Sequence, residues 1–355
     1  MHELVGAIHL HSVYSDGSGT LREMTAAAAR AGLDFVILTD HDTRRAADED
    51  RWQGYRDGVL LVVGVEVSCQ DRTHVVALGP ADAIGLRFKP LRRVLFDLTR
   101  QGAAPFVAHA HPAQIMGISL KGGALHEWEI PGFIGVELWS LMHDICDRLT
   151  PWRVPSFLNH WPDRISGPHP DTVAQWDTIT QHRRFVAIGT LDNHALALPV
   201  LGRRLLPYED TFRALATHVL SEPMTGRPDD ADRVIQALRA GRCFLALDRT
   251  ADARGFRFTG EPEGGGPALV MGEEMTWPGP VRLTVRSPHP ARLVLRRNGA
   301  VAAEAEANTL GHRATEPGVY RAEAHLQGLP WVYTNPIYLW PEGSSAIPPR
   351  KECRR

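Results

Sequence analysis

Seven short apolar runs, each rich in branched residues, alternate with helical patterns through the first two thirds of the chain. We expect these runs to be strands at Leu4–Leu10, Asp34–Leu38, Leu60–Val65, His74–Leu78, Ala104–Ala108, Phe133–Leu138 and Phe185–Thr190. Strands that alternate with helices are typical of βα units, which form a mainly parallel sheet or barrel. A chain of 355 residues is long enough for one such domain and a smaller second one.

The first helix has clear signals at both ends. Thr20 is expected to be its N-cap, Glu23 to complete a capping box, and Gly32 to end the helix. The spacing of apolar residues predicts further helices over Leu91–Gln101, Thr172–Gln181, Glu209–Leu220 and Asp230–Ala240.

The character of the chain changes after Asp248. A Gly/Pro-rich stretch is followed by alternating segments and an Asn-Gly turn, which are typical of short antiparallel strands. We therefore expect a first domain over residues 1–248, a linker over 249–270, a small all-β sandwich over 271–341 and a disordered tail over 342–355.

Composition disfavours several classes of protein. The 39 Lys and Arg residues nearly balance the 41 Asp and Glu residues, whereas proteins that bind nucleic-acid duplexes or anionic membranes normally have a clearly basic surface. No apolar run is long enough to span a bilayer, and the N-terminal sequence lacks the features of a signal peptide. We expect a cytoplasmic protein that acts on a small molecule, and the sequence leaves its oligomeric state open.

Histidines and carboxylates recur at the ends of the expected strands. His9 and His11 end the first strand two positions apart, so both imidazoles are expected to point to the same side. The same spacing recurs at His109 and His111. The other such side chains at or beside strand ends are Asp16, Asp40, His41, Asp42, Glu66, His74, Asp192 and His194.

This recurrence favours a metal site over isolated surface histidines. The carboxyl ends of the strands in a parallel β/α barrel face a common mouth. Carboxylates gathered there repel one another and lose hydration unless cations compensate them. Imidazole with carboxylate suits Mn, Zn or Fe, and the ligands outnumber those of a single catalytic zinc. We expect two or three divalent metal ions that share a carboxylate, with Glu66 and Asp192 as candidates for bridging.

The chain resembles the PHP (polymerase and histidinol phosphatase) superfamily of metal-dependent hydrolases in five motifs, which are HLHSVYSDG, LTDHD, GVEVS with His74 downstream, AHP at Ala110–Pro112, and GTLDNHA. The motifs occur in the order of that superfamily. The resemblance implies an α/β fold with a distorted (β/α)7 TIM-like barrel and up to three metal ions. The pattern RVIQALRAGRCFLALD and the β-rich region after it are similar to the CehA/McbA-like branch.

The resemblance also implies how the ligands divide among three metals. One metal would be held by His9, His11, Glu66 and Asp192, a second by Glu66, His74 and the histidine of the AHP motif, and a third by Asp16, His41 and His194. His111 matches the AHP motif, whereas His109 lies closer to the end of the apolar run, so both are candidates.

Two further residues are candidates for binding substrate. Arg44 follows the second motif, and a guanidinium can donate two parallel hydrogen bonds to a phosphate. Glu137 ends the sixth expected strand, where it would contact substrate or support a metal ligand. His143 lies in a Trp/Pro-rich stretch, Trp139–Pro170, which we interpret as a packed insertion with ordinary loop histidines or as a lid.

Three functions are compatible with these observations. The leading hypothesis is a metal-dependent phosphoesterase that hydrolyses a small phosphorylated metabolite or nucleotide with water activated by the metal ions, and with His194 or Asp42 protonating the leaving group. The alternative uses the same cluster to hydrolyse an amide, carbamate or ester. A third hypothesis is a non-catalytic binding protein with a vestigial barrel.

Overall fold

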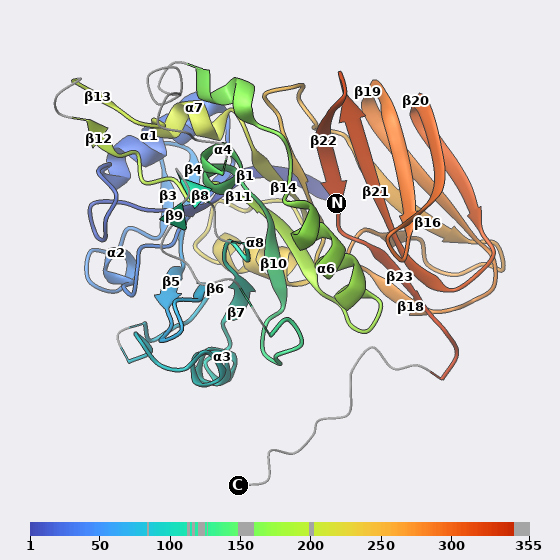
Figure 1. Ribbon diagram of the computed structural model, residues 1–355, viewed down its shortest axis with the longest axis horizontal. Coiled ribbons are helices and arrows are strands. Elements are labelled where there is room, and N and C mark those ends of the chain that lie inside the picture. The colour runs from blue at the N-terminus through green and yellow to red at the C-terminus, as the bar shows by residue number, and fades with distance from the viewer. Residues whose placement is uncertain are drawn as a thin grey trace, which may run out of the picture.

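The computed structural model describes residues 1–83, 85–111, 127–147, 160–198 and 202–343, together with residues 114, 115, 118, 119 and 125 (Figure 1). Most of the tail predicted to be disordered, from residue 344 onward, lies outside the described residues. Residues 148–159 of the Trp/Pro-rich stretch and Pro112 of the AHP motif also lie outside them. No helix in the described part of the chain is long and apolar enough to cross a membrane.

All seven predicted strands are present, and their pairing explains how distant residues meet. They are β1 (His2–Leu10), β2 (Phe35–Leu38), β4 (Val59–Val63) with its continuation β5 (Val65–Ser68), β6 (His74–Leu78), β7 (Ala104–Val107), β10 (Gly135–Ser140) and β11 (Val186–Thr190). β1, β2 and β4 pair in parallel, and so do β7, β10 and β11. β6 is antiparallel to both of its neighbours, β5 and β7.

Hydrogen bonds at the strand ends join these two groups of strands. The Leu191 amide donates to the Ile8 carbonyl at 2.9 Å, which links the end of β11 to β1. The Gly64 amide donates to the Leu38 carbonyl at 2.8 Å. The backbones of His41 and Glu66 form an isolated parallel β-bridge, which links the end of β2 to the start of β5. Pairing and these links thus connect β1, β2, β4, β5, β6, β7, β10 and β11 in a circuit that returns to β1. The ends of strands from many parts of the chain therefore lie around one shared space.

The antiparallel strand β6 accounts for the position of His74. β5 and β6 are joined by a connection of only five residues, 69–73, and so short a link permits a hairpin but no parallel crossover. Ser68 pairs with His74 at the start of β6, and Val75 pairs with Val107 at the end of β7. The first residue of β6 therefore lies at the same end of the sheet as the last residues of β5 and β7.

Helices flank these strands. They are α1 (Leu21–Ala31), α2 (Arg45–Asp48), α3 (Leu91–Arg100), α4 (Leu141–Cys146), α6 (Pro170–Thr180), α7 (Tyr208–Phe212), α8 (Asp230–Arg239) and a 3-10 helix at Trp161–Arg164. The predicted capping box of α1 is confirmed, because the Glu23 amide donates to the Thr20 hydroxyl and the Glu23 carboxylate accepts from the Thr20 amide. Gly32 ends α1 in the left-handed conformation, with φ of 75°.

The predicted helix over Glu209–Leu220 is wrong. α7 ends at Phe212, and the following residues form β14 (Ala216–Ser221), which lies antiparallel between β1 and β15 (Cys243–Ala246). All six side chains of β14 are buried. A strand buried on both faces shows no alternation of buried and exposed residues, so its sequence is hard to distinguish from a short buried helix.

The C-terminal region is all β in its described part. Its strands are β16 (Arg257–Pro262), β17 (Leu269–Val270), β18 (Glu274–Thr276), β19 (Val281–Arg297), β20 (Ala300–Ala314), β21 (Gly318–Leu326), β22 (Leu329–Thr334) and β23 (Ile337–Trp340). The range expected to be a linker, 249–270, differs from that expectation, because β16 pairs along its whole length with β19.

One hydrogen-bonded sheet runs across both parts of the chain. β22 pairs with β15, so the C-terminal strands continue the sheet that holds β1, β2 and β4. In Figure 1 the C-terminal strands, coloured orange to red, stand at one side of the molecule, and α6 lies between them and β10. The remaining short strands are β3 (Gly54–Arg56), β8 (Gln114–Ile115), β9 (Ile118–Ser119), β12 (Ala197–Leu198) and β13 (Arg203–Arg204).

Candidate metal centre and adjoining pocket

The first two histidines converge by a bulge at the end of β1. His9 has a φ of 67°, and the pairing of β1 with β2 shifts register between Ile8 and Leu10. Such a bulge redirects side chains and breaks the simple alternation of a strand. The His9 and His11 rings are both fully buried, with centroids 5.1 Å apart.

Four side chains from three parts of the chain surround one point. The Nε2 atom of His9 lies 3.1 Å from Glu66 Oε2 and 3.4 Å from Asp192 Oδ1. The Nε2 atom of His11 lies 3.2 Å from the same Glu66 oxygen and 3.3 Å from the same Asp192 oxygen. Both nitrogens and Glu66 Oε2 are buried, yet none of them has a hydrogen-bond partner among the described residues. Buried polar atoms are normally satisfied, so such a group indicates a missing partner.

Glu66 is the hub of the cluster. Its Oε1 atom lies 2.9 Å from His74 Nδ1 and 3.0 Å from His109 Nε2, and its Oε2 atom lies 3.2 Å from His41 Nδ1. Burial alone would raise the pKa of Glu66, but the surrounding imidazoles, with His9 and His74 foremost, hold this pKa well below its usual range. The carboxylate is therefore ionised and has imidazole nitrogens close to both of its oxygens.

The carboxylates have the opposite effect on His9. Burial would lower the pKa of His9, but Glu137, Glu66 and Asp192 raise it well above its ordinary value. In the same way the imidazoles hold the pKa of Asp192 well below its usual range, against the effect of burial. The negative charge of this site thus attracts protons strongly, and a cation could take their place.

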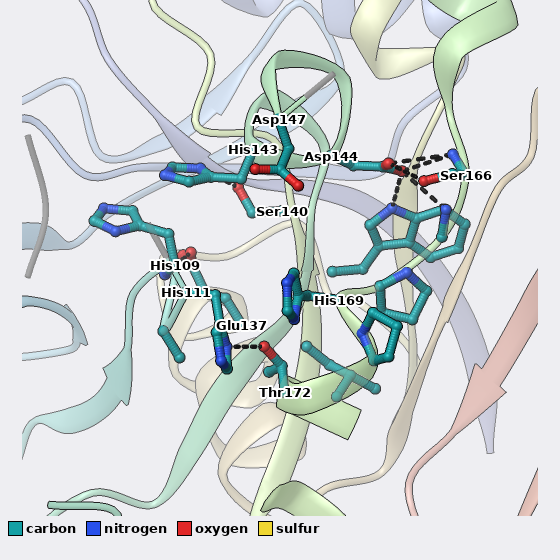
Figure 2. A pocket seen from close by; sticks show the side chains of 16 residues that line it. His109, His111, Glu137, Ser140, His143, Asp144, Asp147, Ser166, His169 and Thr172 are labelled. Atoms are coloured by element: carbon teal, nitrogen blue, oxygen red, sulfur yellow. Dashed lines mark hydrogen bonds between the residues drawn. The ribbon is translucent and has the colours of Figure 1, made fainter. Parts of the chain in front are cut away.

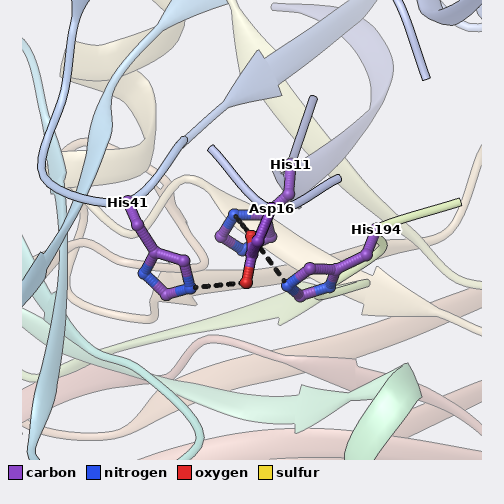
Figure 3. Close-up of side chains that lie close together, drawn as sticks. All are labelled: His11, Asp16, His41 and His194. Carbon is purple, nitrogen blue, oxygen red and sulfur yellow. Dashed lines mark ion pairs between the residues drawn. The ribbon is translucent and has the colours of Figure 1, made fainter. Parts of the chain in front are cut away.

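A second group lies at the more exposed side of the cluster. Asp16 extends toward three histidine rings from the turn after β1 (Figure 3). Its oxygens lie 3.3 Å from His194 Nε2, 3.6 Å from His41 Nε2 and 3.6 Å from His11 Nδ1. The rings of His11 and His194 stack with centroids 4.1 Å apart. The structure therefore brings together Asp16, His41 and His194, the three residues that the resemblance assigns to one metal.

A third group contains a histidine that the sequence analysis did not select. His143, in the first turn of α4, has Nδ1 3.5 Å from Asp192 Oδ2, and its ring stacks on that of His109 with centroids 4.5 Å apart. The Nδ1 atom of His109 is buried and makes no hydrogen bond within the part of the chain that the structure describes. Burial lowers the pKa of His143 to about 3, so its imidazole is neutral. One signal could have identified it, because α4 follows β10 directly and its first turn must lie at the carboxyl end of that strand.

Two buried carboxylates hold the cluster in place. Glu137 lies 2.5 Å from His9 Nδ1 and accepts a hydrogen bond from the His109 amide at 2.8 Å. Asp40 accepts hydrogen bonds from the amide and hydroxyl of Ser12 and from the hydroxyl of Ser15, which fixes the turn that carries Asp16. A carboxylate on Nδ1 of an imidazole leaves Nε2 free to bind a metal.

Three predicted site residues lie apart from these groups. His111 bonds Thr172 at 2.7 Å through Nδ1 and stacks on His169. Asp42 accepts from the Ser68 amide and lies 3.2 Å from Arg87. Arg44 is the N-cap residue of α2, and its buried Nε has no hydrogen-bond partner among the described residues.

A pocket opens beside the third group. Its lining begins at His109, Glu137 and His143 and continues to His111, His169 and Thr172, as Figure 2 shows. Asp144 accepts hydrogen bonds from the Trp139 indole and from the Ser166 hydroxyl, and so ties the segment before α6 to α4. A molecule bound in this pocket would have one end at the cluster and the other between α4 and the start of α6.

The donor set fits divalent cations. Imidazole nitrogens and carboxylate oxygens are ligands that Zn, Mn and Fe share. The described residues contain five groups of His and Asp or Glu atoms that lie close enough together to hold an ion. Four of these groups share His11, His41, Glu66 or Asp192 with one another, and the fifth, which is His111, His169 and Asp171, lies apart. The unpartnered atoms of His9, His11, His41 and Glu66 all belong to these groups.

Part of the chain is similar to two curated proteins. The chain is 36% identical over 81 residues to a phosphoribosyl 1,2-cyclic phosphate 1,2-diphosphodiesterase of Eggerthella lenta, which covers 21% of this chain and 31% of that protein. It is 35% identical over 109 residues to a 3',5'-nucleoside bisphosphate phosphatase of Chromobacterium violaceum, which covers 28% of this chain and 38% of that protein. The chain thus spans about a third of the length of these curated relatives.

Among solved structures, the chain is similar to a two-domain protein of Bacteroides vulgatus described as containing a predicted PHP-like metal-dependent phosphoesterase. The identity is 17%, the TM-score is 0.45, and the match covers 94% of this chain and 95% of that one. Endonuclease Q in complex with a 27-mer duplex substrate matches with 14% identity and a TM-score of 0.43, over 78% of this chain and 60% of that one. Residues 7–131 match the family model of the PHP domain, and the chain therefore carries a PHP domain in this segment.

Proposed function

We propose that this protein is a metal-dependent phosphoesterase that hydrolyses a small phosphorylated metabolite or a nucleotide. The observation that carries the proposal is the set of buried, unpartnered atoms of His9, His11 and Glu66 around one point, beside a pocket. Such a set favours a cation, and the two curated relatives are both named for the cleavage of phosphate esters. Cytoplasmic location and the absence of a nucleic-acid partner stay predictions.

We propose the following division of the ligands. His9, His11, Glu66 and Asp192 hold the first cation, and Asp16, His41 and His194 hold another at the exposed side. For the remaining position the contacts of Glu66 with His74 and His109 support the shared use of its carboxylate, and His143 joins from the side of Asp192. His109 rather than His111 is the proposed ligand, because His109 contacts Glu66 whereas His111 contacts Thr172.

Divalent cations at these positions would lower the pKa of water and offset the negative charge of a phosphoryl group. Side chains of the protein would orient the ligands of these cations. Glu137 keeps the proton of His9 on Nδ1, so that Nε2 carries a lone pair. Both candidates for protonating the leaving group already have other partners, because His194 Nε2 faces Asp16 at the proposed cation site and Asp42 interacts with Ser68 and Arg87. We therefore assign His194 to the cation and neither residue to the protonation of the leaving group.

Two further assignments belong to the same proposal. We propose that the circuit of paired strands is the distorted barrel of the PHP type, with β6 as its antiparallel member. We also propose Arg44 as a phosphate contact, since its buried Nε lacks a partner and its helix begins just after the strand end that carries His41. A guanidinium that is free to donate suits an oxyanion.

The test is a substrate panel with metal-loaded protein. The protein is incubated with Mn, Zn or Fe and assayed on aryl phosphate monoesters, phosphate diesters, nucleotides, aryl carboxylic esters, amides and carbamates. Cleavage of a phosphate ester that is lost in Asp192→Asn supports the proposal. Cleavage of only carbamates, amides or esters would replace it with the alternative reaction at the same cluster. Less than one equivalent of bound metal under these conditions would favour a vestigial barrel.

A further inference from the structure

The wall of the pocket opposite the cluster is formed at the start of α6. His169 precedes this helix, Thr172 lies in its first turn, and both line the pocket. Thr172 Oγ1 lies 2.7 Å from His111 Nδ1, and the His111 and His169 rings stack nearly parallel with centroids 4.3 Å apart. The position of α6 therefore sets the positions of all three side chains.

A buried ion pair attaches α6 to the C-terminal strands. Asp177, in the second half of α6, accepts two hydrogen bonds from Arg321 on β21, from Nε at 2.6 Å and from Nη2 at 2.7 Å. The Arg321 side chain is only 2% exposed and lies over the ring of Trp176, 5.1 Å from its centroid. Its remaining nitrogen, Nη1, donates to Glu323 at 2.5 Å. Two parallel bonds from a guanidinium fix orientation as well as distance.

Further contacts join the same strands to the residues around the pocket. A Cβ on Gly167 would lie 2.8 Å from Cγ of Pro330, so the chain before α6 lies tightly against β22. Tyr333 on β22 packs edge to face on Trp139, with ring centroids 6.3 Å apart, and Trp139 also lines the pocket. Two independent sets of contacts thus hold β21 and β22 against the outer side of this pocket wall.

We infer that the C-terminal β region forms the rear support of the pocket and that Arg321 is a positioning residue for the part of the substrate that does not react. Arg321 holds Asp177, Asp177 fixes α6, and α6 presents His169, Thr172 and, through Thr172, His111. The substrate role of these side chains rests on the proposed function. The support itself does not, because it concerns only how the wall is held.

The arrangement separates the wall from the cluster. His9, Glu66 and Asp192 come from β1, β5 and the end of β11, and none of these strands carries the Arg321 ion pair. Asp177→Asn keeps the volume of the side chain but leaves one acceptor where Arg321 uses two. The guanidinium keeps Glu323 as a partner, so the variant does not isolate a buried charge.

The test compares Asp177→Asn with a matched control in the same region. Glu263→Gln removes an equally bidentate carboxylate, which pairs with Arg313 at 2.9 to 3.1 Å but lies at an exposed site outside the pocket lining. Hydrogen–deuterium exchange is measured in peptides that cover residues 166–176 and, for reference, residues 4–11 and 60–68. Bound metal is counted in parallel, and kcat and KM are measured for phenyl phosphate and for a nucleoside monophosphate.

We expect faster exchange over 166–176 in Asp177→Asn, unchanged exchange in the reference peptides and unchanged metal content. The KM for the nucleotide should rise roughly tenfold while kcat for phenyl phosphate stays within about twofold. Glu263→Gln should match the wild type in every readout. Unchanged exchange over 166–176, or an equal increase in all peptides, overturns the inference.

The two proposals can fail separately. If no phosphate ester is cleaved by the wild type, the proposed function fails, and the exchange data still decide whether β21 supports the wall. If Asp177→Asn does not fold, Arg321→Lys is used, because a single ammonium cannot replace both arms of the fork. Local exchange over 166–176 is again the expected result, and exchange like that of the wild type overturns the inference.

Discussion

Replacing Glu137 by glutamine should weaken metal binding without removing any ligand. Glu137 is 2% exposed and has two contacts, with His9 Nδ1 at 2.5 Å and with the His109 amide at 2.8 Å. Both partners donate, and a carboxylate can accept from both at once. A glutamine side chain has one oxygen and one NH2 group, so it can accept only one of these two bonds without a clash between donors.

Either orientation of the amide disturbs the cluster. If its oxygen faces His9, the His109 amide meets another donor and the backbone of a proposed ligand loses its hydrogen bond. If its NH2 group faces His9, Nδ1 must accept, and the proton moves to Nε2, where a cation would bind. A lost buried hydrogen bond costs about 1 to 3 kcal/mol. Metal affinity should therefore fall roughly 10- to 100-fold, as is typical when such a supporting residue is removed.

The assay is a competition titration of apo protein with a fluorescent chelator and Mn or Zn. The control is Glu3→Gln, because Glu3 also contacts a buried imidazole Nδ1 at 2.8 Å (His218) and a backbone amide at 2.9 Å (Gly255), away from the cluster. Glu3 has one contact that Glu137 lacks, an ion pair with Arg257 at 2.6 Å. The control should bind metal within about twofold of the wild type. Equal metal affinity in Glu137→Gln and Glu3→Gln would refute the reasoning.

Three further predictions follow from the same contacts. Glu66→Gln and Asp192→Asn should each lower kcat/KM by more than the roughly hundredfold expected for a supporting residue, with unchanged far-UV circular dichroism; turnover near the wild-type value at full metal loading would contradict their assignment. Removal of metal by chelation should lower the free energy of unfolding, by about 4 kcal/mol if the free metal concentration before chelation is roughly a thousand times Kd. A melting temperature that does not change when chelator is added would argue against bound cations. Burial would lower the pKa of His218, but Asp248 and Glu3 raise it to about 9. Protonation of His218 therefore adds about 3 kcal/mol to the free energy of unfolding below pH 6.5, and this stabilisation is lost as pH rises through 9. Urea unfolding between pH 6 and 9.5 should show this loss in the wild type, and an equal slope in His218→Gln would count against it.

The strands could be predicted from the sequence because each is a short apolar run between polar or glycine-containing segments. The helix α1 could be predicted because Thr20, Glu23 and Gly32 are local signals whose effect does not depend on the rest of the fold. β14 could not be predicted in this way. Its residues are buried between β1 and β15, and tertiary pairing of that kind overrides local preference.

The site could be predicted less completely, for two physical reasons. His143 comes from a helix that starts immediately after β10, and the sequence does not show that its first turn faces Asp192. The choice between His109 and His111 depends on the irregular backbone at the end of β7, where His109 has a φ of 27°. His9 and Asp192 also have positive φ, of 67° and 50°. Strained residues of this kind cluster at functional sites, and only tertiary contacts hold them there.

The support of the pocket by the C-terminal strands could not be predicted from the sequence. Asp177 and Arg321 are separated by 144 residues, and neither stands in a motif. The expected division into a barrel domain, a linker and a separate sandwich also left out the pairing of β15 with β22, which needs no special residue type because it uses backbone atoms alone.

Anomalous X-ray diffraction at the Mn, Fe and Zn edges, from crystals grown with these metals, tests the central claim most directly. We predict at least two anomalous peaks, one of them within about 2.0 to 2.3 Å of Nε2 of His9 and His11 and of the facing oxygens of Glu66 and Asp192. No peak at this point, with Glu66 instead hydrogen-bonded directly to protonated His9 and His11, would contradict the account.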